Sequence, residues 1–415
     1  MNNINSSKIP NTPINQLNPE LQEKLTNGYP PFIDIHTHIF NYKDIPDYYL
    51  GFRLPISRRF LGFVGFFLHN LIFWTKKDYL SRAAYLIKVL KKKNSSDIFD
   101  SMKKTYYSEY DNSILFGVLT MDMLKGIDGT QDTRTLRDQL FLISKLAKKN
   151  NNIISFAAID PTRNAEALRI FEEVFSINDN DSDLNYVGLK VYPSLGYLPT
   201  HPILMKMFEV CEAKQIPVLS HCSSALTRNS NDSIKNIPGI FINDISLEGE
   251  APKDFKTGGS HKQCEKDYRD YFNRPHHWLK VLETFPNLRL NLAHFGGNKA
   301  WEDFIDKNES IDIQTIPENK KKPWVATIIY LLKKYPNVYA DFSYTFVEEK
   351  FSIRLKELML NDTELTNKIL FGSDYSMVVI EGDYKKKLNN FKSIMQPNLI
   401  NQMARNNNLK YLFNL

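Results

Sequence analysis

The sequence predicts an α/β protein built as one (β/α)8 TIM barrel with long insertions, and three observations lead to this fold class. Eight short apolar runs recur along the 415 residues, and most are followed by a helical pattern. A single barrel suits this length, because such barrels routinely use about 250 residues or more as one domain. The first run ends in HTHIF, whereas an open doubly wound sheet normally carries a glycine-rich first turn for a dinucleotide.

Each apolar run has the length of a buried parallel strand and ends in polar or special residues. The segments between the runs have apolar positions that recur at three and four residues, as in DTRTLRDQLFLISKLAKKN and RNAEALRIFEEVF. In a barrel the carboxyl ends of the strands carry the active site, so functional residues are expected at the ends of the runs. The eight runs cover residues 32–40, 114–123, 153–161, 186–193, 216–223, 288–297, 338–345 and 369–376.

Composition places the chain among ordinary globular proteins and argues against several classes of function. Hydrophobic residues make up 42% and charged residues 24% of the chain. The net charge is +6, but the lysine runs are scattered among acidic residues, which indicates a solvated surface and not a nucleic-acid site. The three cysteines lack CxxC spacing, so they predict neither a disulfide framework nor a thiolate zinc site, and they fit a reducing cytoplasm.

The predicted domain organisation is an N-terminal arm over residues 1–30, without a signal-peptide pattern, followed by one barrel domain over residues 31–415. Two connections, 41–113 after the first strand and 224–274 after the fifth, far exceed the usual loop of about 4 to 6 residues. Both leave the expected active-site face, so we interpret them as a lid or pocket wall. The apolar segment 60–74 is shorter than a membrane span of about 20 residues, and we expect it to be buried against the barrel or a second subunit.

Histidines stand two residues apart at the end of the first run, as His36 and His38. Side chains alternate across a strand, so both imidazoles are expected on the same side. An HxH pair alone is a weak signal. Its position at the carboxyl end of an apolar strand favours a metal site, because catalytic residues of barrels lie there.

Residue types that bind metals or move protons also end later runs. His221 ends the fifth run, His294 the sixth and Asp374 the eighth. Imidazoles with a carboxylate form a nitrogen and oxygen donor set that suits Zn²⁺ and also accepts Mn²⁺, Fe²⁺ or Co²⁺. A catalytic metal keeps one position open for water and lowers the pKa of that water towards about 7.

The order HxH, His, His, Asp at the ends of the first, fifth, sixth and eighth runs resembles the amidohydrolase superfamily. The segments FIDIHTHIF, IPVLSHC, PHHWLKVLETFPNLRLNLAHFGG and ILFGSDYS are similar to its amidohydrolase-related branch, typified by aminocarboxymuconate semialdehyde decarboxylase. The resemblance extends from residue 30 to the end of the chain and implies a barrel of the metallo-dependent hydrolase type with one divalent metal. It implies that His36, His38, His221 and Asp374 bind the metal. Asp374 would also be the general base, and His294 would assist the activated water or the developing oxyanion.

Lys190, at the end of the fourth run in GLKVYP, has two interpretations. In some amidohydrolases a lysine of the fourth strand is carboxylated and bridges two metals. Alternatively, Lys190 binds a substrate carboxylate or pairs with Asp374. Aromatic rings that could stack on a substrate, and a guanidinium that could grip a carboxylate, are weaker candidates for substrate binding. They are Tyr192, Phe295, Tyr375 and Arg163.

The leading hypothesis is a metal-dependent hydrolase that acts on C–N or C–O bonds of a small polar molecule. The alternative is a nonoxidative decarboxylase of an aromatic or unsaturated carboxylic acid, and a third reading is a non-catalytic barrel that keeps a metal and serves as a binding module. We expect a small-molecule substrate, a cytoplasmic location, and no nucleic-acid or membrane partner. A homodimer is an open alternative to a monomer.

Overall fold

The computed structural model of the chain describes residues 17, 19–26, 32–39, 94–110, 114–122, 135–176, 184–224, 270–306, 324–380 and 382–414.

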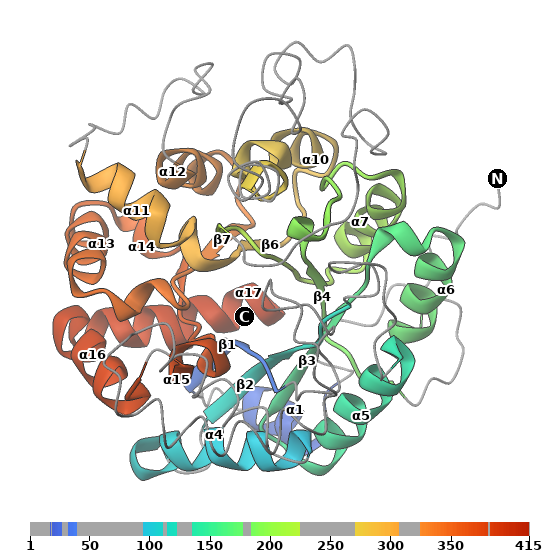
Figure 1. Ribbon diagram of the computed structural model, residues 1–415, viewed down its shortest axis with the longest axis horizontal. Helices are drawn as coiled ribbons and strands as arrows, with labels where there is room; N and C mark the ends of the chain where they lie inside the picture. The colour runs from blue at the N-terminus through green and yellow to red at the C-terminus, as the bar shows by residue number, and fades with distance from the viewer. Residues whose placement is uncertain are drawn as a thin grey trace, which may run out of the picture.

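Eight parallel strands form the centre of the described structure (Figure 1). Each strand pairs with the next one along the chain, in the order β1 to β8. The strands all lie inside the eight apolar runs of the sequence, which confirms the predicted strands. They are β1 (Phe32–Thr37), β2 (Ile114–Leu119), β3 (Ile153–Ala158), β4 (Gly188–Val191), β5 (Val218–Ser220), β6 (Leu290–Leu292), β7 (Val338–Asp341) and β8 (Ile369–Leu370).

Backbone hydrogen bonds link the first strand to the last one and so complete the ring. Ile35 N donates to Phe371 O at 3.2 Å, and Asp374 N donates to His36 O at 2.7 Å. With eight parallel strands in sequential order, these bonds confirm the predicted (β/α)8 barrel.

Helices surround the ring of strands in Figure 1. Their apolar faces and the outward-facing side chains of the strands, such as Phe116, form one large hydrophobic core. Within the described residues, the α-helices between β1 and β8 are α4 (Ser95–Tyr110), α5 (Leu136–Lys149), α6 (Ala165–Val174), α7 (Pro202–Ala213), α10 (Trp278–Thr284), α11 (Gly297–Asp306), α12 (Trp324–Lys334), α13 (Glu349–Asn361) and α14 (Thr363–Thr366). After β8 follow α15 (Tyr375–Ile380), α16 (Tyr384–Asn401), a π-helix (Gln402–Asn407) and α17 (Asn408–Phe413).

The C-terminal helix α17 closes the end of the barrel at which the strands begin. Tyr411 and Leu412 pack in a second hydrophobic core with inward-facing strand residues such as Ile33 and Leu219. Burial of this apolar surface stabilises the fold, because each large side chain removed from water contributes about 1.5 to 3 kcal/mol.

Polar side chains of the same region bind backbone carbonyls of the strands. Asn408 Nδ2 donates to Ile33 O at 2.7 Å and to Phe371 O at 2.8 Å. The hydroxyl of Tyr411 donates to Val218 O at 2.8 Å. These bonds tie the C-terminal region to the backbone of three strands or strand ends and give its buried donors acceptors.

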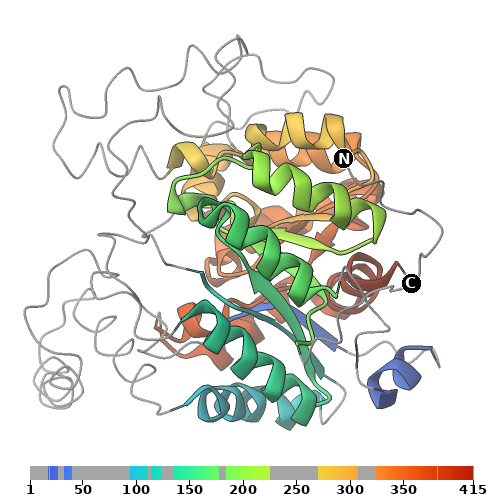
Figure 2. The same ribbon diagram turned by 90° about the vertical axis from the view of Figure 1, so that its right-hand side faces the viewer.

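Part of the predicted N-terminal arm is a helix that packs on the barrel. Helix α1 (Pro19–Thr26) follows Leu17, and both Leu17 and Leu25 belong to the second hydrophobic core. Figure 2 shows α1 and α17 at the same end of the molecule. The described part of the arm is therefore anchored by leucine burial.

The two long insertions lie mostly outside the described residues. Helix α4 belongs to the first insertion, and Phe99 and Met102 pack in the large core. Segment 60–74 and nearly all of 224–274 are among the residues that the structure does not describe. Their roles as lid, pocket wall or subunit contact stay predictions.

Among the described residues, no helix combines the length and the apolarity that crossing a membrane would require.

Candidate metal centre

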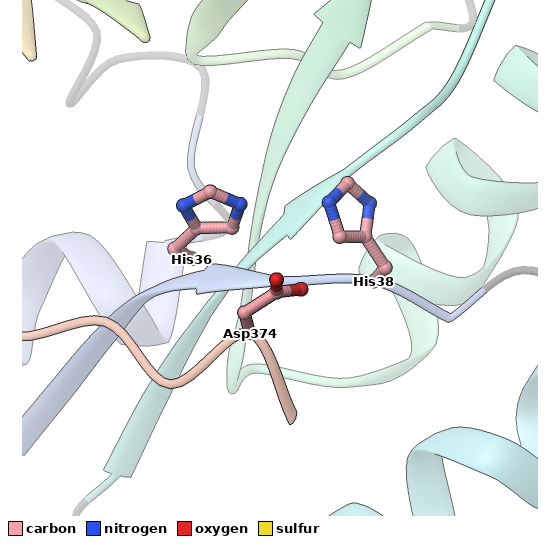
Figure 3. A group of neighbouring side chains, drawn as sticks. All are labelled: His36, His38 and Asp374. Atoms are coloured by element: carbon pink, nitrogen blue, oxygen red, sulfur yellow. The ribbon is translucent and has the colours of Figure 1, made fainter. Parts of the chain in front are cut away.

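His36 and His38 lie at the carboxyl end of β1, where the strand departs from regular alternation. Ile33 faces the barrel interior, so strict alternation would turn His36 away from it. The pairing of β1 with β2 shifts register between Asp34 and Thr37. Irregularities of this kind re-aim side chains beside active sites. Both imidazoles project to the same side (Figure 3), as the HxH spacing predicted.

Glycines on both sides of β1 leave room for this local conformation. A Cβ at Gly117 would lie 2.2 Å from Ile35 O, and Thr37 Oγ1 donates to Gly117 O at 2.9 Å. A Cβ at Gly372 would lie 2.7 Å from His36 Cβ. Side chains cannot approach this closely, so both positions require glycine for the backbone to pass.

The imidazoles of His36 and His38 are oriented by bonds at Nδ1. His36 Nδ1 lies 3.2 Å from Asp341 Oδ2, and His38 Nδ1 lies 3.2 Å from Leu119 O. A carboxylate and a carbonyl can only accept, which assigns the ring proton to Nδ1 in both histidines. The Nε2 atoms then carry the lone pair that binds a metal, and such bonds at the opposite nitrogen are the usual support of metal-bound histidines.

Asp374 brings a carboxylate to these histidines from the turn after β8. Ligand atoms of His36, His38 and Asp374 lie within 4.8 Å of one another, as Figure 3 illustrates. Asp374 has a φ of 52°, a left-handed conformation that costs a residue other than glycine roughly 1 to 3 kcal/mol. Burial raises the pKa of the Asp374 carboxyl to about 6, although His36 and Lys190 oppose this rise.

The donor atoms of this group fit a divalent cation. Asp374 Oδ1 is buried and has no hydrogen-bond partner in the described part of the chain. Burial also lowers the pKa of His38 and His221 well below the ordinary value and that of His294 to about 3. Neutral imidazoles and a carboxylate oxygen without a donor are the forms that bind a metal.

Asp341, the last residue of β7, joins the histidines of two strands. Its Oδ2 accepts from Asn291 Nδ2 at 2.8 Å, and its Oδ1 accepts from His294 N at 3.0 Å and from the Ser343 hydroxyl. Burial alone would raise the pKa of the Asp341 carboxyl. His36, His294 and these bonds lower it by a larger amount, so the pKa of Asp341 lies well below its usual range. Asp341 therefore stays ionised and holds His36 and His294 in place.

Asp341 also belongs to a second group of close ligand atoms, together with His36 and His294, again within 4.8 Å. Our sequence analysis did not select it, because Asp341 lies inside the run VYADFSYT and not after it. The available signal was a carboxylate in an otherwise apolar strand, a position where a buried charge needs partners.

His221 and His294 form a neighbouring pair. His221 Nδ1 lies 3.1 Å from His294 Nε2, and His221 Nε2 lies 3.1 Å from Ser223 Oγ. His294 Nδ1 lies 3.2 Å from the carbonyl of Ser343, which must accept a proton. The proton of His294 is thus on Nδ1, and its Nε2 accepts from His221. His221 is not part of either close group of ligand atoms among the described residues, so its metal role stays a prediction.

Lys190 is fully buried at the end of β4. Its Nζ has no hydrogen-bond partner within the residues that the structure describes. Burial lowers the pKa of Lys190 to about 8, while the charges of Asp341 and Asp374 act in the opposite direction. The structure therefore places Lys190 with the predicted site residues, as the sequence analysis expected, without a direct bond to Asp374.

Two weak candidates for substrate binding are engaged elsewhere, which corrects their interpretation. Arg163 forms a two-pronged ion pair with Asp122, at 2.8 Å from Nε and 2.7 Å from Nη2. Phe295 is completely buried in the large core, with its ring 5.3 Å from that of Trp301. Its φ of 45° is left-handed, so strand alternation does not predict its direction. Arg163 and Phe295 are structural residues in the described protein.

The two remaining candidates differ in their surroundings. The ring of Tyr192 lies 4.6 Å from that of His221 and 5.9 Å from Lys190 Nζ, so it borders the site. Tyr375 begins α15 and packs against Tyr384, with ring centroids 4.8 Å apart. Tyr192 is therefore the better supported candidate for substrate binding.

A buried network behind β1 was also missed by the sequence analysis. Asp34 Oδ1 accepts from Ser373 N at 2.8 Å and from His36 N at 3.4 Å, and Oδ2 accepts from the Tyr106 hydroxyl at 2.7 Å. Tyr106 in turn bonds to Tyr384. This carboxylate ties the chain beside His36 to the turn that carries Asp374. Its only sequence signal was an Asp in the middle of an apolar run.

Three further residues of metal-binding types have structural roles. Cys222 packs in the large core. His201 Nδ1 accepts from Ile203 N and caps α7. His277 is buried and bonds to Tyr271 O at 2.8 Å.

A comparison with models of protein families tests the resemblance of this chain to amidohydrolases. The model described as amidohydrolase matches residues 33–410, which is most of the chain. The chain belongs to the amidohydrolase family. This amidohydrolase carries the HxH pair, both later histidines and the final aspartate inside the matched region. The comparison with curated proteins gave no significant match.

Solved structures with a similar fold include enzymes of different reaction types. A dihydroxybenzoic acid decarboxylase from Polaromonas sp. JS666, with bound manganese and 2-nitroresorcinol, is 16% identical with a TM-score of 0.49, covering 93% of this chain and 97% of that one. A probable 2-pyrone-4,6-dicarboxylic acid hydrolase from Acinetobacter baumannii is 12% identical with a TM-score of 0.48, covering 93% and 100%. A zinc-bound amidohydrolase from Burkholderia multivorans is 10% identical with a TM-score of 0.45, covering 76% and 88%.

Proposed function

We propose that this amidohydrolase is a metal-dependent hydrolase of C–N or C–O bonds in a small polar molecule. The convergence of His36, His38 and Asp374, with a buried carboxylate oxygen that lacks a donor, is the observation that carries the proposal. We propose Zn²⁺ as the metal, because imidazole and carboxylate ligands suit it, and the same set accepts Mn²⁺, Fe²⁺ or Co²⁺.

Four residues would hold this metal. His36, His38 and Asp374 form the close group. We retain His221 as the fourth ligand, because its ring lies 4.8 Å from that of His294, which in turn lies 4.8 Å from that of His36. Asp341 supports the set through His36 Nδ1.

The protein residues supply proton transfer and orientation. A divalent metal provides Lewis acidity, which makes water a nucleophile near neutral pH. The Asp374 carboxylate would bind the metal through one oxygen and accept a proton at the other. His294 holds its own proton at Nδ1 against Ser343 O, and its Nε2 accepts from His221 Nδ1, so it orients His221 in the described structure. We keep His294 as the residue that would assist the activated water or the developing oxyanion.

Decarboxylation is the second candidate, and a specific observation supports it. A decarboxylase must hold the substrate carboxyl group with a fixed cation in a dry pocket. Lys190 is a buried ammonium without a partner in the described structure, whereas Arg163 is bound to Asp122. We rank hydrolysis first because it requires only a metal set together with Asp374 and His294, and the described site offers candidates for each.

A substrate screen in labelled water tests the reaction type. Metal-replete protein is incubated in H₂¹⁸O with lactones, amides, and aromatic and enoic acids, and the products are measured by mass spectrometry. Hydrolysis places one ¹⁸O in the product acid. Release of CO₂ from an acid, with no label in the organic product, would replace hydrolysis by decarboxylation.

We also propose a cytoplasmic location and a small molecule as the partner, with no nucleic acid and no membrane. The reduced cysteines and the scattered lysines of the sequence support these proposals. A homodimer is tested by the sedimentation coefficient of the purified protein.

A further inference from the structure

We infer that Lys190 is the recognition group for a carboxylate of the substrate, so that the natural substrate is a carboxylate-bearing molecule. The inference rests on the proposed function, because it concerns the same pocket, and it narrows the substrate from a small polar molecule to an organic acid. It applies to both reaction types: the carboxylate is a spectator in hydrolysis and the leaving group in decarboxylation.

Lys190 points into the barrel beside the metal residues. Its neighbours on β4, Leu189 and Val191, pack outwards in the core under the helices, so alternation turns Lys190 inwards. Its Nζ lies 5.9 Å from the ring of Tyr192, which in turn lies 4.6 Å from the ring of His221 on the next strand end. Lys190 thus stands among groups from more than one strand.

The ammonium of Lys190 lacks an acceptor in the described structure. An ammonium has three donors, and Nζ bonds to none of the described residues. Asp341 is already occupied at both oxygens, by His36, Asn291, Ser343 and the backbone of His294. Leaving a charged donor buried and unsatisfied is costly, so a function must maintain it.

Asp374 does not satisfy this ammonium either. Its Oδ1 also lacks a partner, which shows that the two groups do not bond to each other. We assign Asp374 to the metal, which leaves Lys190 for the substrate.

A carboxylate is the substrate group that suits this ammonium. It carries the opposite charge and offers two acceptor oxygens to the Nζ donors, which have no acceptor in the described structure. Tyr192, with its ring 5.9 Å from Lys190 Nζ, provides a flat wall beside the ammonium. A neutral acceptor lacks the opposite charge, and a cation is repelled.

Binding of matched acids and amides tests the inference. Acetate and benzoate, with acetamide and benzamide as neutral counterparts, are titrated by calorimetry into metal-loaded wild-type protein, Lys190→Met and Lys190→Gln. Lys206→Met removes one exposed lysine charge from α7 and is the matched control. We expect both Lys190 variants to bind the carboxylates about 10- to 100-fold more weakly, because a hydrogen bond to a charged group is lost. Binding of the amides and metal content should not change, and Lys206→Met should match wild type.

Three results would overturn the inference. One is unchanged carboxylate binding in both Lys190 variants, and another is the absence of carboxylate binding by wild-type protein at millimolar concentration. The third is a wild type with two metals that falls to one in Lys190→Met, because a carboxylated, bridging lysine would then be present. The proposed function fails separately, if the screen in labelled water finds no hydrolysis while the acids still bind through Lys190.

Discussion

The two ends of the barrel differ in what their buried polar groups contact. At the end closed by α17, Asn408 and Tyr411 donate to strand carbonyls, and apolar side chains fill the space between them. Asn408 Oδ1 and Arg289 Nε lack a partner there, but both side chains bond through another atom. At the opposite end, Lys190 Nζ and Asp374 Oδ1 are buried without a partner in the described structure. His294 and Asp374 there also adopt left-handed backbone conformations.

This difference separates stability from function within one fold. Apolar packing at the α17 end raises the free energy of unfolding. Strained backbone and unpartnered charged groups at the other end lower it, and they are available to bind a ligand. Substitutions at the α17 end should therefore lower stability and leave the site intact. Substitutions at the metal end should change activity or metal binding, and some should raise stability.

The largest effect is expected for Asp374→Asn at the metal end. The amide keeps an oxygen for coordination but cannot accept a proton, so turnover should fall about 10²- to 10⁴-fold. Steady-state kinetics on a substrate from the screen measures the loss, and metal content and melting temperature serve as controls. An Asn variant with near wild-type turnover would remove Asp374 from the role of base.

At the opposite end, Leu412→Ala should reduce the free energy of unfolding by about 2 to 5 kcal/mol, because it creates a cavity in the second core. Urea unfolding measures this change. The exposed Leu360→Ala on α13 is the matched control and should change stability by less than about 0.5 kcal/mol. Loss of the metal from folded Leu412→Ala protein would contradict the claim that substitutions at the α17 end leave the metal site intact.

Gly372→Ala should weaken metal binding by roughly 10- to 100-fold, the usual effect of disturbing the support of a ligand. The added Cβ would lie 2.7 Å from His36 Cβ and displace that ring. Competition with a chelator measures the affinity. Gly382→Ala, where a Cβ meets no atom within 4 Å, strains a backbone with a φ of 123° and is expected to affect stability alone. Equal metal affinities of the two variants would show that a Cβ at position 372 does not displace His36.

The smallest effect is a gain in stability. Lys190→Met should raise the free energy of unfolding of the metal-free protein by about 1 to 3 kcal/mol at pH 7, because it removes an unsatisfied buried charge. The folded pKa of about 8 lies below the ordinary 10.5, so the wild-type penalty is full below pH 8 and disappears as the pH rises to 10.5. Urea unfolding at pH 7 and at pH 10 measures the difference between the two proteins. A stability gain of Lys190→Met that is larger at pH 10 than at pH 7 would contradict this prediction.

The sequence predicted the barrel because its strands are buried on both faces and therefore stand out as apolar runs. It also predicted which residues gather at one end, since His36, His38, His221, His294 and Asp374 all end such runs. The metal roles of these residues stay predictions. The register shift in β1 was not predictable, because it depends on pairing with a strand about 80 residues away in sequence.

Residues that act through distant partners were the ones that sequence analysis missed or misjudged. Asp341 gains its role from Asn291, which is 50 positions away, and from His36 on β1. Arg163, which follows β3, forms an ion pair with Asp122, which follows β2. No local pattern in the sequence indicates this pair. Local rules predicted direction along regular strands and failed at Phe295, where the backbone is left-handed.

Metal analysis of purified protein tests most directly the claim that the end of the barrel with His36, His38 and Asp374 is a metal site. Elemental analysis of wild type and of the double variant His36→Ala with His38→Ala compares metal content, with circular dichroism as the control for folding. We predict about one divalent metal per wild-type chain and almost none in the folded double variant. A wild type that binds no metal after exposure to Zn²⁺ and Mn²⁺, or a double variant that retains its metal, would contradict the account.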